Sequence, residues 1–362
     1  MTEKFIRKHI QSIDPYQPII PLDVLSTQLG IPLEKLVKLD ANENPYGMAP
    51  ASKRRLANLS FGHIYPDPES RFLRQGLSEF LKVPTENILV GAGADELIDL
   101  IMRLAIEPGD KIINCPPTFG YYDADAQVND LKIVNVKRKP DFSLDFTGIE
   151  KAVAQGAKVL FLANPNNPDG GVIPPADLKK LLALPLLVVL DEAYVEFARP
   201  YESRIPEVLK RDNLIVLRTF SKWGGLAGLR LGYGIFPRNL ADAMMKIKPP
   251  YNVSVAAQQA GLGALEDLEV LNTRLEKILM QRERLMDGIN QLDFLKPYPS
   301  RANFILCKVV KGDAKQLKLS LAQKGILIRY FNKPGLSDHV RFSIGQPEAI
   351  GQLLAALEEL QP

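Results

Sequence analysis

Seven short apolar runs between residues 86 and 236 constrain the possible fold more than any other feature of this sequence. Glycine, proline or asparagine residues bound the runs, and helical patterns such as ADELIDLIMRLAI at residues 94–106 separate several of them. Short runs of this kind are typical of strands buried on both faces of a sheet. Their alternation with helices predicts an α/β domain with a mostly parallel sheet. The runs are NILV, DKIINC, LKIVNV, KVLFLA, LLVVL, NLIVL and GYGIF.

A change of pattern after Pro249 and Pro250 predicts a second, smaller domain. A long amphipathic pattern covers residues 264–292 approximately, and we interpret it as a helix that links two domains. Short alternating strands such as ANFILCKV and HVRFSI follow, around one further helical pattern. We therefore divide the chain into an N-terminal arm at 1–40, a large α/β domain at 41–265 and a small α+β domain at 266–362.

The composition argues against several classes of protein. The 45 lysine and arginine residues nearly balance the 42 aspartate and glutamate residues and are dispersed, so we do not expect a nucleic-acid partner. The sequence has no run of about 18 apolar residues, and MTEKFIRKHI lacks the apolar core of a secretion signal, so we expect a cytoplasmic protein. Cys115 and Cys307 lie outside any CxxC pattern, and the histidines have no metal-binding spacing, so we expect neither a disulfide nor a metal site.

Candidate ligand residues follow the strands, because ligands of parallel α/β sheets bind outside the carboxyl ends of the strands. The run NILV precedes GAGADE, where Gly93, Ala94 and Asp95 would present backbone N–H groups and a helix N-terminus to an anion. The same residues also suit an ordinary turn between a strand and a helix, and Glu96 replaces the third glycine of a dinucleotide motif. Both interpretations of this turn stay open.

Three further strand ends carry residues that suit a flat ligand. PPTFGYY contains Phe119, which could stack on a ring or pack in the core. NPNNPDGG contains Asn167, whose amide could shape the turn or bind a ligand oxygen. Asp191 directly follows the apolar run LLVVL, where an unpaired carboxylate is costly, so it needs a cationic partner unless it only caps a helix.

The segment RTFSKWGGLAGLRLGYG, residues 218–234, follows the apolar run NLIVL. It places Lys222 and Arg230 among glycines, whose small size lets the backbone approach another group closely. A lysine in such a pocket, near a second cation, is a candidate nucleophile toward a carbonyl group, although a lone lysine is more often a solvated surface residue. No single segment is decisive, but their coincidence after successive strands favours one ligand site.

The whole set resembles the fold-type I pyridoxal-phosphate enzymes, and within them the histidinol-phosphate aminotransferase family. The resemblance extends over almost the whole chain. It implies a large domain with a central, mostly parallel seven-stranded sheet, a smaller C-terminal α+β domain, and pyridoxal 5′-phosphate as the cofactor. The motifs that carry it are LDANENPYG at 39–47, YPDP at 65–68, GAGADELIDL, PPTFGYY, NPNNPDG, DEAYVEF, SKWGGLAGLRLGYG and RANFIL.

The resemblance implies a cofactor role for each matching residue. Lys222 would bind the cofactor covalently and later move the proton of the substrate Cα, and Asp191 would pair with the ring nitrogen. Tyr194 and Asn167 would hydrogen-bond the ring hydroxyl oxygen. Phe119 occupies the position where the family stacks an aromatic side chain, often tyrosine, on the ring. The residues that would hold the phosphate are Gly93, Ala94, Asp95, Ser221 and Arg230.

The resemblance also implies an assembly and a substrate pocket. Tyr65 would reach the phosphate bound by the other subunit, which implies a homodimer with shared active sites. Arg341 matches the small-domain arginine that binds an acidic group, and Arg329 resembles its partner for a substrate phosphate. Tyr16 and Asn44 would line the same pocket. Two arginines suit a ligand that is alternately a phosphate monoester and the side-chain carboxylate of glutamate.

The implied activity converts histidinol phosphate and 2-oxoglutarate to imidazole-acetol phosphate and glutamate, and the reverse, in histidine biosynthesis. An aromatic-amino-acid aminotransferase and a lyase such as a threonine-phosphate decarboxylase are alternatives, and a non-catalytic small-molecule-binding regulator is a third. Two departures from the family motifs, Asp169 in NPNNPDG and Trp223 with Gly224 after Lys222, adjoin the expected cofactor site. We expect that they could alter the substrate range.

Overall fold

The structure, a computed structural model, describes residues 3–15 and 18–361 and contains two β-sheets. The seven strands of the larger sheet lie in the order β2-β8-β7-β6-β5-β3-β4. Each of the seven apolar runs forms one of these strands, so the predicted fold class is confirmed. The strands are β2 (Ile88–Gly91), β3 (Lys111–Asn114), β4 (Lys132–Asn135), β5 (Ala157–Ala163), β6 (Leu187–Asp191), β7 (Leu214–Thr219) and β8 (Gly232–Ile235).

The larger sheet is parallel except for β8. Parallel ladders join β4, β3, β5, β6 and β7, whereas β8 runs antiparallel to both β7 and β2. β2 therefore runs in the same direction as β5, β6 and β7, and these four strands end at one edge of the sheet. That edge is where ligands bind in parallel α/β sheets.

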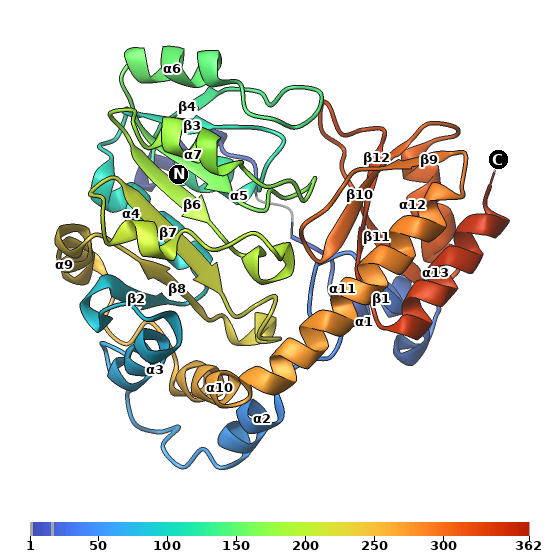
Figure 1. The fold of residues 1–362 in the computed structure, drawn as a ribbon, viewed down its shortest axis with the longest axis horizontal. Helices are drawn as coiled ribbons and strands as arrows, with labels where there is room; N and C mark the ends of the chain where they lie inside the picture. The colour runs from blue at the N-terminus through green and yellow to red at the C-terminus, as the bar shows by residue number, and fades with distance from the viewer. Residues whose placement is uncertain (1–2, 16–17, 362) are drawn as a thin grey trace.

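Helices cover both faces of the larger sheet (Figure 1). Side chains of β6 alternate between two apolar layers, with Val189 in one layer and Val188 and Leu190 in the other. This burial on both sides explains why the strands are continuous apolar runs. The helices of the Val189 layer are α4 (Ala94–Ala105), α5 (Tyr121–Val128) and α9 (Arg238–Ile247). The helices of the other layer are α6 (Phe146–Ala154), α7 (Pro175–Leu181) and α8 (Ile205–Val208).

The smaller sheet has five strands in the order β1-β11-β12-β10-β9. We call the larger sheet with its helices the larger body, and the smaller sheet with its helices the smaller body. The 23-residue helix α11 (Leu268–Asn290) extends from the larger body to the smaller sheet (Figure 1). The strands are β1 (Val37–Leu39), β9 (Leu295–Pro297), β10 (Phe304–Val309), β11 (Ile326–Tyr330) and β12 (His339–Ser343). The helices beside them are α1 (Leu22–Leu29), α12 (Ala314–Gln323) and α13 (Pro347–Glu359).

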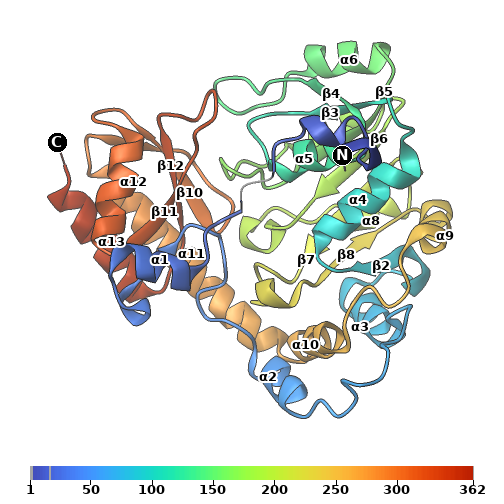
Figure 2. The ribbon, with the colours of Figure 1, turned by 180° about the vertical axis from the view of Figure 1, so that it is seen from behind.

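β1 pairs in parallel with β11 although it belongs to the segment that the sequence assigns to an N-terminal arm. Earlier in that segment, His9 Nε2 lies 3.2 Å from the carbonyl oxygen of Val128 at the end of α5, on the side of the molecule seen in Figure 2. The described part of residues 1–40 therefore contacts both bodies, and the division into three domains stays a prediction. The short 3₁₀ helices are η1 (Glu3–Phe5), η2 (Ile10–Ser12), η3 (Leu33–Lys35), η4 (Thr85–Asn87), η5 (Val195–Ala198) and η6 (Ala227–Leu229).

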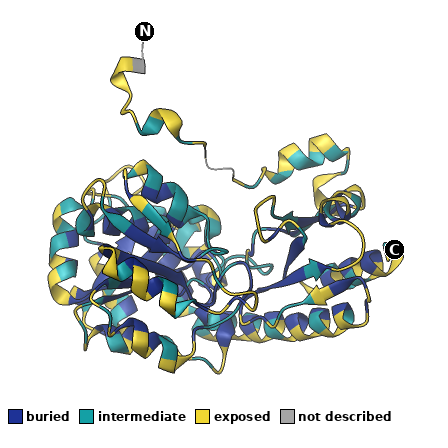
Figure 3. Cartoon of the chain, turned by 90° about the horizontal axis from the view of Figure 1, so that it is seen from above, coloured by how far each residue is buried: buried dark blue, intermediate teal, exposed yellow. Residues whose placement is uncertain are grey.

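Three further helices close the lower side of the larger body in Figure 1. They are α2 (Pro50–Ala57), α3 (Arg71–Leu81) and α10 (Val255–Glu266). The buried residues lie along the strands and on the inner faces of the helices, and the outer helix faces are exposed (Figure 3). Among residues 3–15 and 18–361, no helix is both long enough and apolar enough to cross a membrane.

Candidate active site

Most of the residues predicted to hold a ligand lie at the carboxyl end of the larger sheet. Asp191 ends β6, Asn167 follows β5, Lys222 follows β7, and α4 begins at Ala94 shortly after β2. Arg341, on β12 of the smaller sheet, donates a hydrogen bond of 2.5 Å from Nη1 to Asn167 Oδ1. The site therefore lies where the two sheets meet.

Asp191 is a buried carboxylate at the end of the central strand of the larger sheet, with 5% of the residue exposed. Its Oδ2 accepts a hydrogen bond of 2.8 Å from the Tyr122 hydroxyl, and its Oδ1 accepts one of 3.0 Å from the Ala193 N–H. Burial raises the pKa of Asp191 to about 6, and the hydrogen bond from Tyr122 opposes that rise. At pH 7 the side chain is mainly ionised, and its remaining lone pairs can accept a hydrogen bond from a ligand.

Lys222 lies in the loop after β7. Its Nζ donates a hydrogen bond of 3.2 Å to the carbonyl oxygen of Ala41 and lies 5.8 Å from the centre of the Tyr194 ring. The glycines after it have a steric cause, because a Cβ atom on Gly225, where φ is +68°, would lie 2.3 Å from the carbonyl oxygen of Gly47. The group that Gly225 allows to approach closely is therefore Gly47, in the chain's own segment at residues 39–47.

The turn before α4 brings Gly93 and Arg230 together. Gly93 has a φ of +85°, and a Cβ atom there would lie 2.6 Å from Arg230 Nη2. The same Nη2 donates a hydrogen bond of 2.7 Å to Asp95 Oδ2, and both side chains are partly exposed. Glu96 Oε2 accepts a hydrogen bond of 2.6 Å from the Ala92 N–H. The first backbone N–H groups of α4 and the Arg230 guanidinium together suit an anion.

Ser221 lies close to this helix start. Thr219, the last residue of β7, pairs with Gly232 of β8. Gly232 in turn lies against the start of α4, because a Cβ atom built on it would be 2.3 Å from the Ala94 nitrogen. The Thr219 hydroxyl donates a hydrogen bond of 2.9 Å to Ser221 Oγ and accepts one of 3.0 Å from the Ser221 N–H. The Ser221 hydroxyl can therefore donate its own hydrogen to a ligand. The sequence analysis did not select Thr219, although this hydroxyl residue lies two positions before Ser221, which it did select.

Tyr194 is 6% exposed, and its hydroxyl accepts a hydrogen bond of 3.2 Å from Asn42 Nδ2. Asn42 is held in turn from the smaller body, since its N–H donates to Ser343 Oγ at 2.8 Å and its carbonyl oxygen accepts from Asn303 Nδ2 at 2.9 Å. Sequence reasoning selected Asn44 from the motif LDANENPYG and missed Asn42. Only its contacts with residues far away in the sequence distinguish Asn42 from its neighbours.

Arg329 and Arg341 are opposite each other on the paired strands β11 and β12, so their side chains lie on one face of the smaller sheet. Arg341 is buried, and its Nη2 donates a hydrogen bond of 2.9 Å to the carbonyl oxygen of Asp40. Both guanidinium groups lie over the Phe331 ring, at 5.7 Å for Arg329 and 5.6 Å for Arg341. Two neighbouring arginines suit a doubly charged anion such as a phosphate monoester.

Two other predicted residues, Phe119 and Asn44, have contacts of a different kind. The Phe119 ring meets the Tyr122 ring edge-on, with 5.5 Å between the ring centres. Asn44 Nδ2 donates a hydrogen bond of 2.8 Å to the carbonyl oxygen of Trp223, so it supports the loop that carries Lys222. Tyr16 lies outside the described residues.

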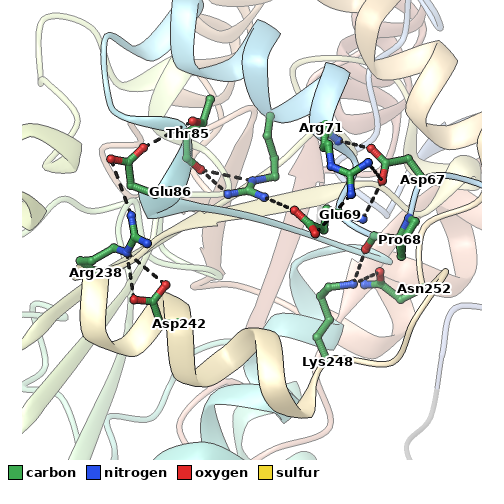
Figure 4. Close-up of polar contacts among 11 residues, drawn as sticks. Asp67, Pro68, Glu69, Arg71, Thr85, Glu86, Arg238, Asp242, Lys248 and Asn252 are labelled. Atoms are coloured by element: carbon green, nitrogen blue, oxygen red, sulfur yellow. Dashed lines mark hydrogen bonds and ion pairs between the residues drawn. The ribbon is translucent and has the colours of Figure 1, made fainter.

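Tyr65 is 78% exposed and lies on a loop that several hydrogen bonds hold in place. Lys248 Nζ donates to the carbonyl oxygen of Pro68 at 2.9 Å and to Asn252 Oδ1 at 2.8 Å (Figure 4). Asn252 Nδ2 donates a hydrogen bond of 2.6 Å to Glu96 Oε2 in the first turn of α4. An exposed aromatic ring on an ordered loop is available for contact with another molecule.

The two departures from the family motifs have structural roles. Trp223 is 5% exposed, and its ring stacks on Phe80 of α3 with 5.9 Å between ring centres and 7° between planes. Asp169 is also buried, and its carboxylate accepts hydrogen bonds from Asn166 Nδ2 and, at 2.8 Å, from the Gly171 N–H. Trp223 therefore packs in the core and Asp169 shapes the turn after β5.

The model of the family described as "Aminotransferase class I and II" matches residues 34–357. The chain belongs to this family. It is 51% identical over 358 residues to "Histidinol-phosphate aminotransferase, chloroplastic" of Nicotiana plumbaginifolia, an alignment that covers 98% of this chain and 86% of the relative. It is 46% identical over 364 residues to the histidinol-phosphate aminotransferase of Roseiflexus castenholzii, with 98% of each chain covered.

A solved structure of a family member supports the same grouping. The crystal structure of histidinol-phosphate aminotransferase from Sinorhizobium meliloti in complex with pyridoxal-5′-phosphate has a TM-score of 0.87 to this chain. The two are 30% identical, and the match covers 98% of this chain and 96% of that chain. The family resemblance that the motifs predict is therefore confirmed.

Proposed function

We propose that this chain is a pyridoxal-phosphate-dependent aminotransferase that interconverts histidinol phosphate and 2-oxoglutarate with imidazole-acetol phosphate and glutamate. One observation carries the proposal: a lysine, a buried carboxylate and the N-terminus of helix α4 lie at the same edge of one sheet. The similarity over nearly the whole chain to two histidinol-phosphate aminotransferases supports the substrate.

The residues at this edge fit the chemical groups of pyridoxal phosphate. Lys222 Nζ suits the aldehyde, and the buried, ionised carboxylate of Asp191 suits the protonated ring nitrogen. Gly93 leaves the start of α4 open at a point where a Cβ atom would collide with Arg230, and Ser221 has a hydroxyl hydrogen to donate. The residues that would hold the phosphate are Gly93, Ala94, Asp95, Ser221 and Arg230. When bound, the cofactor supplies a conjugated ring that accepts the electron pair of the substrate Cα.

The chain's own residues would orient the reactants and move the proton. Lys222 would take the proton from the substrate Cα and deliver it to the C4′ carbon of the cofactor, and it would move the proton the opposite way in the reverse reaction. Tyr194 and Asn167 would hydrogen-bond the ring hydroxyl oxygen, with Asn42 fixing the direction of the Tyr194 hydroxyl. Phe119 would stack on the ring face.

The substrate pocket that we propose lies on the side of the smaller sheet. Arg341 and Arg329 would bind the phosphate of histidinol phosphate or the side-chain carboxylate of glutamate. Their placement on one face of the sheet and Arg341's hydrogen bond to Asn167 support this assignment. Asn44 and Tyr16 would line the same pocket.

We also propose a homodimer in which Tyr65 reaches the phosphate bound by the partner chain. The exposure of the Tyr65 ring supports this arrangement, and analytical ultracentrifugation would test it. We also propose a cytoplasmic location, and a division into an arm at 1–40, a large domain at 41–265 and a small domain at 266–362. The name of the Nicotiana relative includes the word chloroplastic, so the compartment of this protein needs its own localisation experiment.

Steady-state kinetics with two amino acceptors would test the substrate. We expect the kcat/KM for imidazole-acetol phosphate to exceed that for phenylpyruvate by a large factor. Phenylpyruvate has no phosphate for Arg329 and Arg341 to bind, and each missing charged hydrogen bond costs roughly 1.5–3 kcal/mol of binding free energy. A preference for phenylpyruvate would favour an aromatic-amino-acid aminotransferase. Release of carbon dioxide from a phosphorylated amino acid would favour the lyase.

A further inference from the structure

Tyr122 has no part in the function proposed above, although it lies beside Asp191. The residue is in the first turn of α5 and is 0% exposed. Its hydroxyl donates a hydrogen bond of 2.8 Å to Asp191 Oδ2, while Ala193 supplies the hydrogen bond to Oδ1. The two oxygens of the carboxylate are therefore held from different elements, one from α5 and one from the turn after β6.

Two aromatic contacts fix the Tyr122 ring. Phe161 of β5 stacks on it, with 5.5 Å between ring centres and 28° between planes. Phe119 meets it edge-on, at 5.5 Å and 88°. Tyr122 is therefore in contact with two of the residues proposed to contact the cofactor ring, Asp191 at the ring nitrogen and Phe119 at the ring face.

We propose that Tyr122 is a positioning residue that keeps the Asp191 carboxylate ionised and directed at the cofactor ring and that holds Phe119 in its plane. The proposal rests on the cofactor site described above. A carboxylate that accepts a hydrogen bond is favoured in its charged form, and a buried donor is not replaced by water when it is removed.

The charges around Asp191 make this hydrogen bond important. Burial acts to protonate the carboxylate, and the negative charge of Asp95 on α4 acts in the same direction. Tyr122, the Ala193 N–H and the positive charge of Lys222 act against protonation. Burial and the neighbouring Asp191 raise the pKa of Tyr122 well above its usual value, so the hydroxyl remains a donor at every pH at which the protein is studied.

The substitution Tyr122→Phe removes the donor and keeps the ring contacts. We expect the titration midpoint of Asp191 in the cofactor-free protein to move upward by about one pH unit, since the lost hydrogen bond is to a charged group. We expect the dissociation constant for pyridoxal phosphate to rise by about eightfold at pH 5.5, by about twofold at pH 7, and not at pH 8.5, where Asp191 is ionised in both proteins.

Two measurements on the full chain test this. NMR of protein labelled with ¹³C at the aspartate carboxyl groups gives the Asp191 midpoint without cofactor, with Asp191→Asn used to assign the signal. Titration with pyridoxal phosphate between pH 5.5 and 8.5 gives the affinity. Tyr233→Phe is the matched control, because Tyr233 is a buried tyrosine, 2% exposed, on β8 of the sheet that carries Asp191, and we expect neither quantity to change.

A second variant covers the case in which Tyr122→Phe does not fold. A fluorinated tyrosine placed at position 122 is a stronger donor of the same shape, so it should move the Asp191 midpoint downward. An unchanged midpoint in either variant overturns the proposal, and so does a loss of affinity that is the same at every pH. Wild-type protein that binds no pyridoxal phosphate would refute the proposed function, whereas normal binding by both wild type and Tyr122→Phe would refute only the role of Tyr122.

Discussion

The substitution Gly93→Ala tests whether the start of α4 and Arg230 form the phosphate site. Gly93 has φ +85° and ψ 167°, a conformation that residues with a side chain avoid at a cost of about 1–3 kcal/mol. The new methyl group would also lie 2.6 Å from Arg230 Nη2. Because that atom is the end of a partly exposed, flexible side chain, the guanidinium would move aside with little further loss of stability.

Gly109→Ala is a matched control. Gly109 has a φ of +87°, and no atom lies within 4 Å of a Cβ built on it, so this variant changes the backbone cost alone. We expect both variants to lower the free energy of unfolding by a similar amount, about 1–3 kcal/mol. Only Gly93→Ala should lose the hydrogen bonds from Arg230 to the phosphate, at about 1.5–3 kcal/mol, which corresponds to a rise of roughly 10- to 150-fold in the dissociation constant.

Urea unfolding of the cofactor-free proteins gives the stabilities. Titration with pyridoxal phosphate gives the affinities, and the fluorescence of Trp223, the single tryptophan of the chain, is a reporter directly beside Lys222. If Gly93→Ala binds the cofactor as tightly as Gly109→Ala does, the Arg230 guanidinium is not where the phosphate binds and our assignment of this turn is refuted.

Three further predictions concern Lys222, Trp223 and Asp191. Lys222→Ala should abolish transamination and leave the circular dichroism spectrum unchanged, since within residues 3–15 and 18–361 the amine makes one hydrogen bond, of 3.2 Å, to the carbonyl oxygen of Ala41. Substantial residual turnover would contradict its role. Trp223→Ala should lower the free energy of unfolding by about 3–5 kcal/mol in urea, because the ring is 5% exposed, yet leave the ratio of kcat/KM for imidazole-acetol phosphate and phenylpyruvate unchanged. A changed ratio would show that Trp223 acts on specificity. Asp191→Asn should raise the free energy of unfolding of the cofactor-free protein by roughly 1 kcal/mol more at pH 8 than at pH 5. The reason is that the pKa of Asp191 in the folded protein is raised to about 6, so the wild type loses stability as the pH rises toward 6 and the asparagine variant does not. An equal effect at both pH values would contradict this.

The larger sheet was predictable because its strands are buried on both faces. Such strands are continuous apolar runs, so each run can be found without knowing its neighbours, and Asp191 at the end of β6 follows directly from the pattern. β1 and β9 have three residues each, too few for any periodicity, and β1 is recognisable only through its pairing with β11. The assignment of β1 to an arm reflects this limit.

The contacts that orient the site residues were not predictable from local patterns. Asn42 and Ser343 are 301 positions apart in the sequence, and the Tyr122 hydroxyl and Asp191 are 69 apart. Tyr122 lies beside Tyr121 in the motif PPTFGYY, which also contains Phe119, but the motif alone does not indicate which of these rings packs against the sheet. Aromatic residues in a turn fit core packing and ligand stacking equally well, and only the fold decides between them.

Several residues of this site have a burial or a backbone conformation that costs folding free energy. Asp191 is a buried carboxylate, and Asn42 and Arg230 have φ values of +56° and +52°, a region that residues with a side chain seldom occupy. Conformations of this kind persist only where surrounding contacts compensate them. Asn42 is held by Ser343 and Asn303 of the smaller body and itself donates to Tyr194 of the larger one. The packing of the two sheets against the segment at residues 40–44 therefore maintains the geometry of the site, because the direction of the Tyr194 hydroxyl depends on Asn42.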